Sequence, residues 1–132
     1  MLKELVGKWK VIGCQLNAEW LPYSIFQEFR YSFNADDTYK LAWSELSYPQ
    51  FVGGFPKSKT GKVVIHSKSD GAHQQIDLIP HDGPFAGKEL KGIFELDHDV
   101  LKAIFSFPGT ERPTVFNTTQ GQVYEIWQRV SE

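Results

Sequence analysis

Residues 90–107 carry the clearest structural signal in the chain: Leu-Lys-Gly-Ile-Phe-Glu-Leu-Asp-His-Asp-Val-Leu-Lys-Ala-Ile-Phe-Ser-Phe. Apolar or small residues alternate with polar ones on both sides of Asp97-His98-Asp99: Leu90, Gly92, Phe94 and Leu96 against Lys91 and Glu95, then Leu101, Ala103, Phe105 and Phe107 against Lys102 and Ser106. Period-two alternation around a short polar turn is typical of an antiparallel hairpin with one face in solvent.

The rest of the chain continues this pattern in short segments separated by turn residues. We expect further strands at residues 9–16, 28–33, 38–44, 61–67, 74–79 and 122–130, with an extended segment at 112–116. Residues 17–26 predict a short helix, with Asn17 as its possible cap, that could lie across an opening as a lid. The sum is an all-β chain of about eight strands. It predicts an up-and-down antiparallel barrel or a sandwich, and closure into a barrel removes exposed edges.

Composition narrows the class of protein. The 132 residues fit one domain, spanning 1–132, with a hydrophobic fraction of 41% and an aromatic fraction of 14%. Net charge is −2 and the basic residues are scattered along the sequence, which argues against nucleic acid as a partner. Cys14 is the single cysteine, so no internal disulfide is expected. No apolar run approaches the roughly 20 residues of a membrane span.

These totals also give expectations for location and assembly. A cytoplasmic protein is expected for the chain as written, or a periplasmic or secreted one if a signal peptide has been removed. We expect a monomer or a weak homodimer. The four histidines fit no zinc spacing and there is no glycine-rich phosphate loop, so the sequence predicts neither a metal nor a cofactor.

Two sets of residues resemble a known superfamily. Gly7-Lys8-Trp9, at the start of the first expected strand, is similar to the Gly-x-Trp motif of lipocalins and their calycin relatives. The run from Ile93 to Lys102, the Arg112-Pro113-Thr114 segment and Ile76-Asp77-Leu78 resemble a bacterial lipocalin-like domain family of unknown function, of the planctomycete type. Ile104 stands where many members carry Cys, and His98 replaces a turn Gly.

The resemblance implies a fold and a general activity. Trp9 would plug the closed end of a barrel next to Gly7, and Arg129, near the end of the last strand, would pack over the indole. The superfamily binds small, mostly apolar molecules, which implies sequestration or transport with no bond changed. Fold alone does not dictate activity, so the binding function follows only by analogy.

Residue parity then places candidate side chains inside the barrel. Glu125 shares parity with Trp127 and Arg129, and an interior carboxylate must find a partner or take up a proton. The candidate pocket wall consists of Tyr31, Phe33, Tyr39, Leu41, Trp43, Phe94 and Phe105, and the alternative for the same residues is simple core packing. Arg112 either pins the segment before the last strand, through carbonyls or a carboxylate such as Glu95, or meets an anionic ligand at the mouth.

Three functions therefore stay open. The first is binding of a small hydrophobic or amphipathic molecule, with Glu125 or Arg112 orienting it. The second is an enzyme of isomerase or cyclase type, with Glu125 or Asp77 as acid/base and Tyr31 as donor; a second polar group within reach of Glu125 would favour it. The third is a structural or partner-binding module with a filled barrel, marked by an exposed apolar patch at Phe51, Val52 and Phe55.

Overall fold

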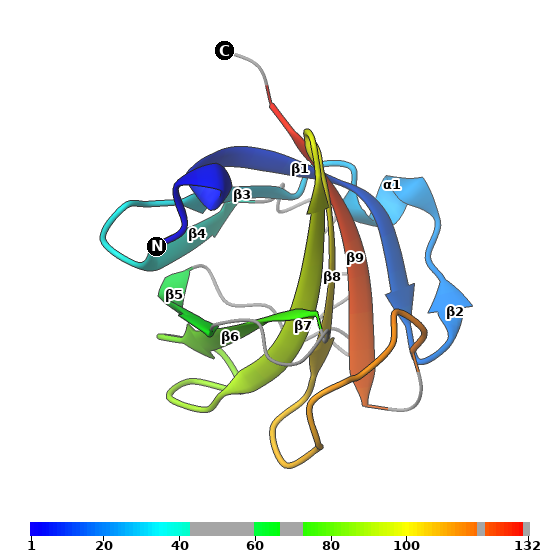
Figure 1. Ribbon diagram of the computed structural model, residues 1–132. Coiled ribbons are helices and arrows are strands. Elements are labelled where there is room, and N and C mark those ends of the chain that lie inside the picture. Colours follow the sequence, from blue (N-terminus) through cyan, green and yellow to red (C-terminus); the bar gives the residue numbers. More distant parts are fainter. Residues whose placement is uncertain (43–59, 67–72, 119–120, 131–132) are drawn as a thin grey trace.

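The computed structural model describes residues 1–42, 60–66, 73–118 and 121–130. One antiparallel sheet has the order β2-β1-β3-β4-β5-β6-β7-β8-β9, and a further pairing of β1 with β9 closes it into a barrel (Figure 1). The elements are η1 (Lys3–Leu5), β1 (Gly7–Leu16), β2 (Glu19–Trp20), α1 (Tyr23–Phe26), β3 (Arg30–Phe33), β4 (Thr38–Ala42), β5 (Thr60–His66), β6 (Gln74–Pro80), β7 (Leu90–Asp97), β8 (Val100–Ser106) and β9 (Gln122–Arg129). Because β2 has only 2 residues, the barrel wall is made by the eight other strands, and the predicted fold is confirmed.

The hairpin expected at residues 90–107 forms as β7 and β8. Leu96 pairs with Leu101 and Asp97 pairs with Val100, so the connection is the two residues His98 and Asp99. His98 has φ 56°, the left-handed conformation that two-residue hairpin turns require and that glycine adopts most easily. The local sequence pattern therefore sets both the register and the turn.

The segment between β1 and β3 differs in detail from the expectation. Asn17 does not cap the helix: Asn17 and Ala18 have φ 49° and 71°, and they turn the chain into β2. The Asn17 side-chain oxygen instead accepts a hydrogen bond from Gly121 N at 2.9 Å. Helix α1 begins only at Tyr23, after Pro22, because a residue before proline is disfavoured in the helical region.

A β-bulge in β1 decides which of its side chains face inward. Val11 pairs with Trp127 and Gly13 pairs with the preceding residue, Ile126, so Ile12 is an extra residue on β1. Under strict alternation, Cys14 would lie on the other face of the strand from Trp9 and Val11. The bulge brings Cys14 to their face, where it is buried. Strict alternation therefore fails at Cys14, although it holds for Trp9 and Val11.

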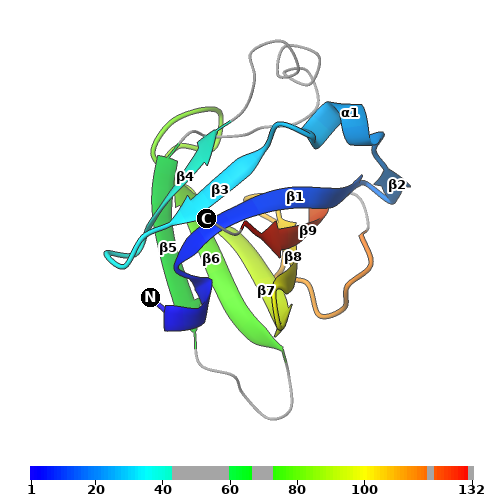
Figure 2. The ribbon, with the colours of Figure 1, turned by 90° about the horizontal axis from the view of Figure 1, so that it is seen from above.

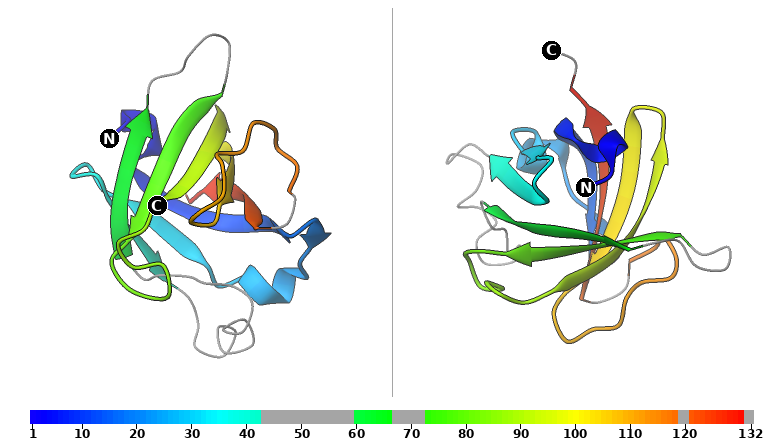
Figure 3. Two further views of the ribbon diagram at one scale, coloured as in Figure 1. Left: turned by 90° about the horizontal axis from the view of Figure 1, so that it is seen from below. Right: turned by 60° about the vertical axis from the view of Figure 1, so that its left-hand side comes forward.

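The segment 107–118 runs along the outside of the barrel beside β8 and β9 (Figure 3). It is irregular rather than a strand, and its Phe116 packs against a small buried cluster of Ile93, Ile104 and Tyr124. Phe94, the neighbour of Ile93, belongs to the main core inside the barrel. Since successive strand residues face opposite sides, this part of the wall is buried on both faces.

Trp43 and the loop residues Phe51, Val52 and Phe55 lie outside the described residues. Among those that are described, no helix has the length and apolar character needed to span a membrane. Trp9 near the start of β1 pairs with Arg129 at the end of β9, so the first and last strands meet at this end of the barrel, beside η1 (Figure 2).

Candidate functional site

Glu125 on β9 is the buried carboxyl group inside the barrel. Its neighbours across the sheet are Cys14 on β1 and Ala103 on β8, both of them buried core residues. The side chain is 1% exposed, and its Oε1 accepts a hydrogen bond from Trp127 Nε1 at 2.9 Å. The expected inward direction of Glu125 is therefore correct.

Tyr31 on β3 is a second polar group within reach of Glu125. Burial raises the pKa of the Tyr31 phenol well above its usual value, and the charge of Glu125 and a hydrogen bond to its carboxyl raise it further. The charge of Tyr39 also raises the pKa of Tyr31. A phenol that stays protonated donates to a carboxylate, so Tyr31 and Trp127 Nε1 both direct hydrogen atoms at Glu125.

Aromatic rings pack around this carboxyl group. Tyr31 lies 4.5 Å from Trp127 between ring centroids and 5.9 Å from Phe33, with which it is stacked. Phe33 in turn lies 5.4 Å from Trp127 and 6.3 Å from Tyr39. The described residues of the expected wall, namely Tyr31, Phe33, Tyr39, Leu41, Phe94 and Phe105, are each at most 3% exposed. Together these six side chains form a continuous aromatic and aliphatic surface inside the barrel, which we call the floor. Its role in ligand binding stays a prediction.

Trp9 and Arg129 meet at the end of the barrel, as the motif implied. The Arg129 Cζ atom lies 4.3 Å from the centroid of the Trp9 ring, and Trp9 Nε1 donates to the Leu5 carbonyl at 3.0 Å. Arg129 also donates to the carbonyls of Val6 at 3.2 Å and of Glu4. One guanidinium thus ties β9 to the segment that precedes β1.

Gly7 makes room for this arrangement. It has φ 130°, and a Cβ atom added there would lie 3.3 Å from Arg129 Nη1. A larger residue would therefore meet both a strained backbone and the guanidinium. The Gly7-Lys8-Trp9 motif is explained locally by this contact.

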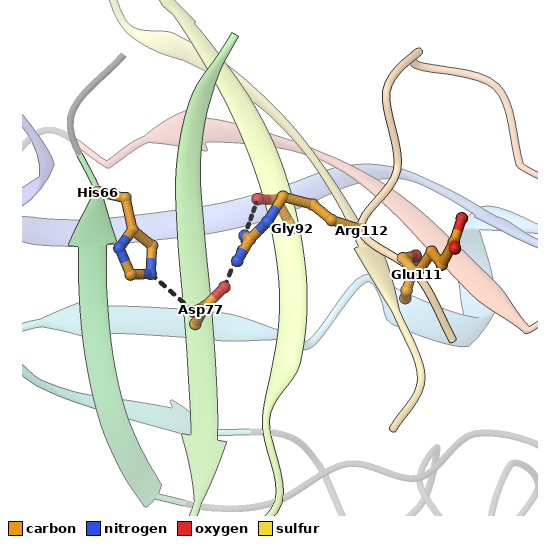
Figure 4. A network of polar contacts seen from close by, with 6 residues as sticks. His66, Asp77, Gly92, Glu111 and Arg112 are labelled. Carbon is orange, nitrogen blue, oxygen red and sulfur yellow. Dashed lines mark hydrogen bonds and ion pairs between the residues drawn. The ribbon is translucent and has the colours of Figure 1, made fainter. Parts of the chain in front are cut away.

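A second polar network lies on the outer face of the barrel (Figure 4). Asp77 on β6 accepts hydrogen bonds from Arg112 Nη1 at 2.6 Å and pairs with His66 Nε2 at 2.8 Å. Arg112 Nη1 also donates to the Gly92 carbonyl at 2.8 Å. Burial opposes ionisation of Asp77, but the hydrogen bonds from Arg112 and His66 outweigh it and lower the pKa of the carboxyl.

The outer network corrects one sequence-based expectation and bears out another. Asp77 is not an interior acid/base, because its neighbours Ile76 and Leu78 belong to the main core and Asp77 points to the opposite face. Arg112 pins its segment through a carbonyl and a carboxylate, as one of its two expected roles has it; the carbonyl is that of Gly92 and the carboxylate is Asp77. Nothing in the sequence pattern signalled the partnership with His66, since the two strands become neighbours only in the sheet.

Arg112 also borders a hollow of about 310 Å³ on the outer face, next to His73, Gln75 and Thr114. A ligand role for Arg112 would therefore belong outside the barrel. In the part of the chain that the structure describes, no three acidic, His or Cys side chains gather in a way that could hold a metal ion.

Comparisons with protein-family models, curated proteins and solved structures found no match to this chain. The resemblance to lipocalin-like domains thus stays an expectation from the sequence, and the site must be interpreted from its own geometry.

Proposed function

We propose that the barrel binds a small, mostly apolar molecule whose single polar group is a hydrogen-bond donor directed at Glu125. The observation that carries the proposal is a carboxyl group 1% exposed among aromatic rings, with the phenol of Tyr31 and the indole of Trp127 fixing its orientation. Ligand pockets are mostly apolar with a few fixed polar groups, and this floor has that character.

The electrostatics favour one class of ligand over another. Burial raises the pKa of the Tyr31 phenol and the charge of Glu125 raises it further, so burial and this charge both disfavour a second negative charge in this region. A neutral amine, an alcohol or a cation fits, whereas a fatty acid would place a second carboxylate beside the first. Because the floor side chains are at most 3% exposed, a ligand that reaches Glu125 must displace at least one ring.

Two measurements test the proposal. Native mass spectrometry of freshly purified protein is expected to show a co-purified small molecule. Fluorescence titration with N-phenyl-1-naphthylamine, a neutral apolar amine, is expected to saturate, while the related anionic anilinonaphthalene sulfonate binds more weakly. Absence of both a co-purified molecule and saturable amine binding would overturn the proposal.

A matched pair of variants separates a ligand contact from loss of stability. Glu125→Gln is expected to weaken amine binding about tenfold, since a charge-assisted hydrogen bond becomes a neutral one. Asp77→Asn changes a carboxyl that is equally buried but lies on the outer face, and it should leave that affinity unchanged. Equal losses in both variants would assign the effect to folding and would count against an interior site.

An enzyme is the second candidate, because Tyr31 supplies the second polar group expected of an interior acid/base pair. Glu125 would accept a proton and Tyr31 would donate one, as isomerisation or cyclisation requires. Incubating the co-purified molecule with fresh protein distinguishes the two functions: a changed mass or chromatographic position indicates catalysis. Loss of that change in Tyr31→Phe, with affinity retained, would identify Tyr31 as the donor.

A further inference from the structure

Four basic side chains form a cluster on the outside of β1, β3 and β4, which we call the basic wall: Lys8, Lys10, Arg30 and Lys40. Lys8 pairs with Ser32, and Ser32 pairs in turn with Lys40 on the next strand. Lys10 pairs directly with Arg30. The intervening residues of these strands are buried in the core, so the basic side chains project from the opposite face.

The basic wall is not explained by the stability of the sheet. Like charges at directly opposite positions, such as Lys10 and Arg30, destabilise an antiparallel pair. Within the part of the chain that the structure describes, none of these three lysines is joined to an acidic group by an ion pair. Arg30 donates to the carbonyls of Gln27 and Phe29 at 2.8 and 2.9 Å, which leaves its positive charge in place.

This concentration of charge stands out against the rest of the molecule. The whole chain has a net charge of −2. Across β1, β3 and β4, however, one row of paired residues is Lys8, Ser32 and Lys40, and the next row is Lys10, Arg30 and Ala42. The acidic residues nearest along the chain are Glu28, two positions before Arg30, and Asp36 and Asp37 in the β3–β4 turn. Asp36 accepts a hydrogen bond from the Thr38 hydroxyl. The wall therefore presents a positive potential to solvent.

A hollow of about 440 Å³ opens within the basic wall. It is lined by Lys8 and Lys40 on either side, by Ser32 between them, and by Gly7 and Asn34 toward one end. Asn34 Nδ2 donates to Thr38 Oγ1 at 3.0 Å, and a side-chain amide carries a second hydrogen that it can donate. The hollow thus combines two ammonium groups with a hydroxyl and an amide donor.

We propose that this hollow binds a phosphate group. A phosphate carries up to two negative charges on several acceptor oxygens, so it can meet both lysines and the Ser32 hydroxyl at once, which a single planar carboxylate would not do as fully. Lysine acts in such sites as a point charge. The group can belong to a soluble phosphate compound or to the head group of an acidic lipid, and the site lies outside the barrel interior in either case.

The first test uses inorganic pyrophosphate and ¹⁵N-labelled protein. Saturable shifts are expected at the amides of Gly7, Lys8, Ser32 and Asn34, with little change on β7 and β8. In Lys8→Gln/Lys40→Gln the affinity should fall roughly tenfold, the sum of two partly exposed ion pairs. Lys91→Gln/Lys102→Gln removes the same charge from exposed positions of β7 and β8, and it should bind as the wild type does.

The second test asks which source of phosphate is bound. Flotation with phosphatidylcholine vesicles, with and without phosphatidic acid, is compared with the pyrophosphate titration. Binding of pyrophosphate alone indicates a soluble ligand, and binding to the acidic vesicles that is lost in the Lys8/Lys40 variant indicates a lipid head group. Binding to neither, or equal losses in the two double variants with unchanged circular dichroism, would overturn the proposal.

Discussion

The guanidinium of Arg129 lies over the Trp9 indole, 4.3 Å from the ring centroid, and so joins the last strand of the barrel to the first. Trp9 is 0% exposed, and its N–H donates to the Leu5 carbonyl. Cation and ring are both partly desolvated here, which raises the energy of their contact above that of an exposed pair. The barrel closes here, because β1 and β9 pair from Trp9–Arg129 at one end to Leu16–Val123 at the other.

Trp9→Ala is expected to lower the free energy of unfolding by about 3–5 kcal/mol, the range for truncating a buried large aromatic side chain. Chemical denaturation and near-ultraviolet circular dichroism measure the effect. Trp20, which is 57% exposed on β2, provides a matched control, and Trp20→Ala should cost less than about 1 kcal/mol. A Trp9→Ala protein with wild-type stability and near-ultraviolet signal would show that the indole does not hold the barrel closed.

Asp77 should make the free energy of unfolding fall as the pH is lowered into the acid range. The pKa of the Asp77 carboxyl is lowered in the folded state, so in acid the unfolded chain binds more protons than the folded one. The contribution of Asp77 to the free energy of unfolding is therefore fully present above the unfolded-state pKa, and it is lost as the pH falls through the folded-state pKa. Asp77→Asn is therefore expected to cost about 3 kcal/mol near neutral pH, as for removal of one member of a buried ion pair.

Urea unfolding of wild type and Asp77→Asn from about pH 7 to about pH 2 measures this difference. The gap between the two proteins should narrow as the solution becomes more acid. Asp99→Asn removes an exposed carboxylate that pairs with Arg129 and should cost less than about 1 kcal/mol throughout. A gap that stays constant with pH would mean that Asp77 is not held as an anion by Arg112 and His66.

Tyr31 should make the free energy of unfolding fall as the pH is raised into the alkaline range. Its folded-state pKa is raised, so the unfolded state loses its phenolic proton first, and stability falls as pH rises above the unfolded value. This group alone contributes a slope of about 1.4 kcal/mol per pH unit above about pH 10. Tyr31→Phe should show a smaller decline between about pH 9 and about pH 11 in urea unfolding.

The exposed Tyr23 supplies the comparison, and Tyr23→Phe should follow the wild-type alkaline decline. If Tyr31→Phe also followed it, the phenol would not be buried against Glu125 in solution.

Gly61 and Tyr39 should be energetically coupled. They are paired across β4 and β5, and a Cβ atom at Gly61 would overlap the Tyr39 ring. Gly61→Ala is expected to cost about 1–3 kcal/mol in the wild-type background, as overpacking does. In Tyr39→Leu the cost should fall below about 1 kcal/mol, and a double-mutant cycle measures the difference. Additive effects would mean that the ring does not lie over the glycine.

The strands were predictable where alternation is strict and the turn is local. In β7 and β8, polar residues mark one face and His98-Asp99 closes the hairpin, so register follows from neighbouring residues alone. The inward direction of Glu125 followed in the same way from its parity with Trp127. The burial of Cys14 does not follow from alternation, because a bulge inserts Ile12 where β1 pairs with β9 across the closed barrel.

The candidate sites depend on a different kind of information. Asp77 was named beside Glu125 as a candidate acid/base, because alternation does not say which face of a strand becomes the inside when both are covered. The segment 107–118 buries the outer face of β7 to β9, and Arg112 reaches Asp77 from that segment. Such a contact joins residues 35 positions apart and has no signature in either local pattern.

The amino-acid sequence by itself determined that the chain forms short antiparallel strands, since side-chain period and turn chemistry act between neighbours. Only the tertiary structure decided which polar groups share a site. Lys8, Lys10, Arg30 and Lys40 look dispersed along the chain, yet pairing of β1, β3 and β4 brings them together on one face. Strand pairing converts large separations in sequence into spacings of about 5 Å, and charge acts over distance in space.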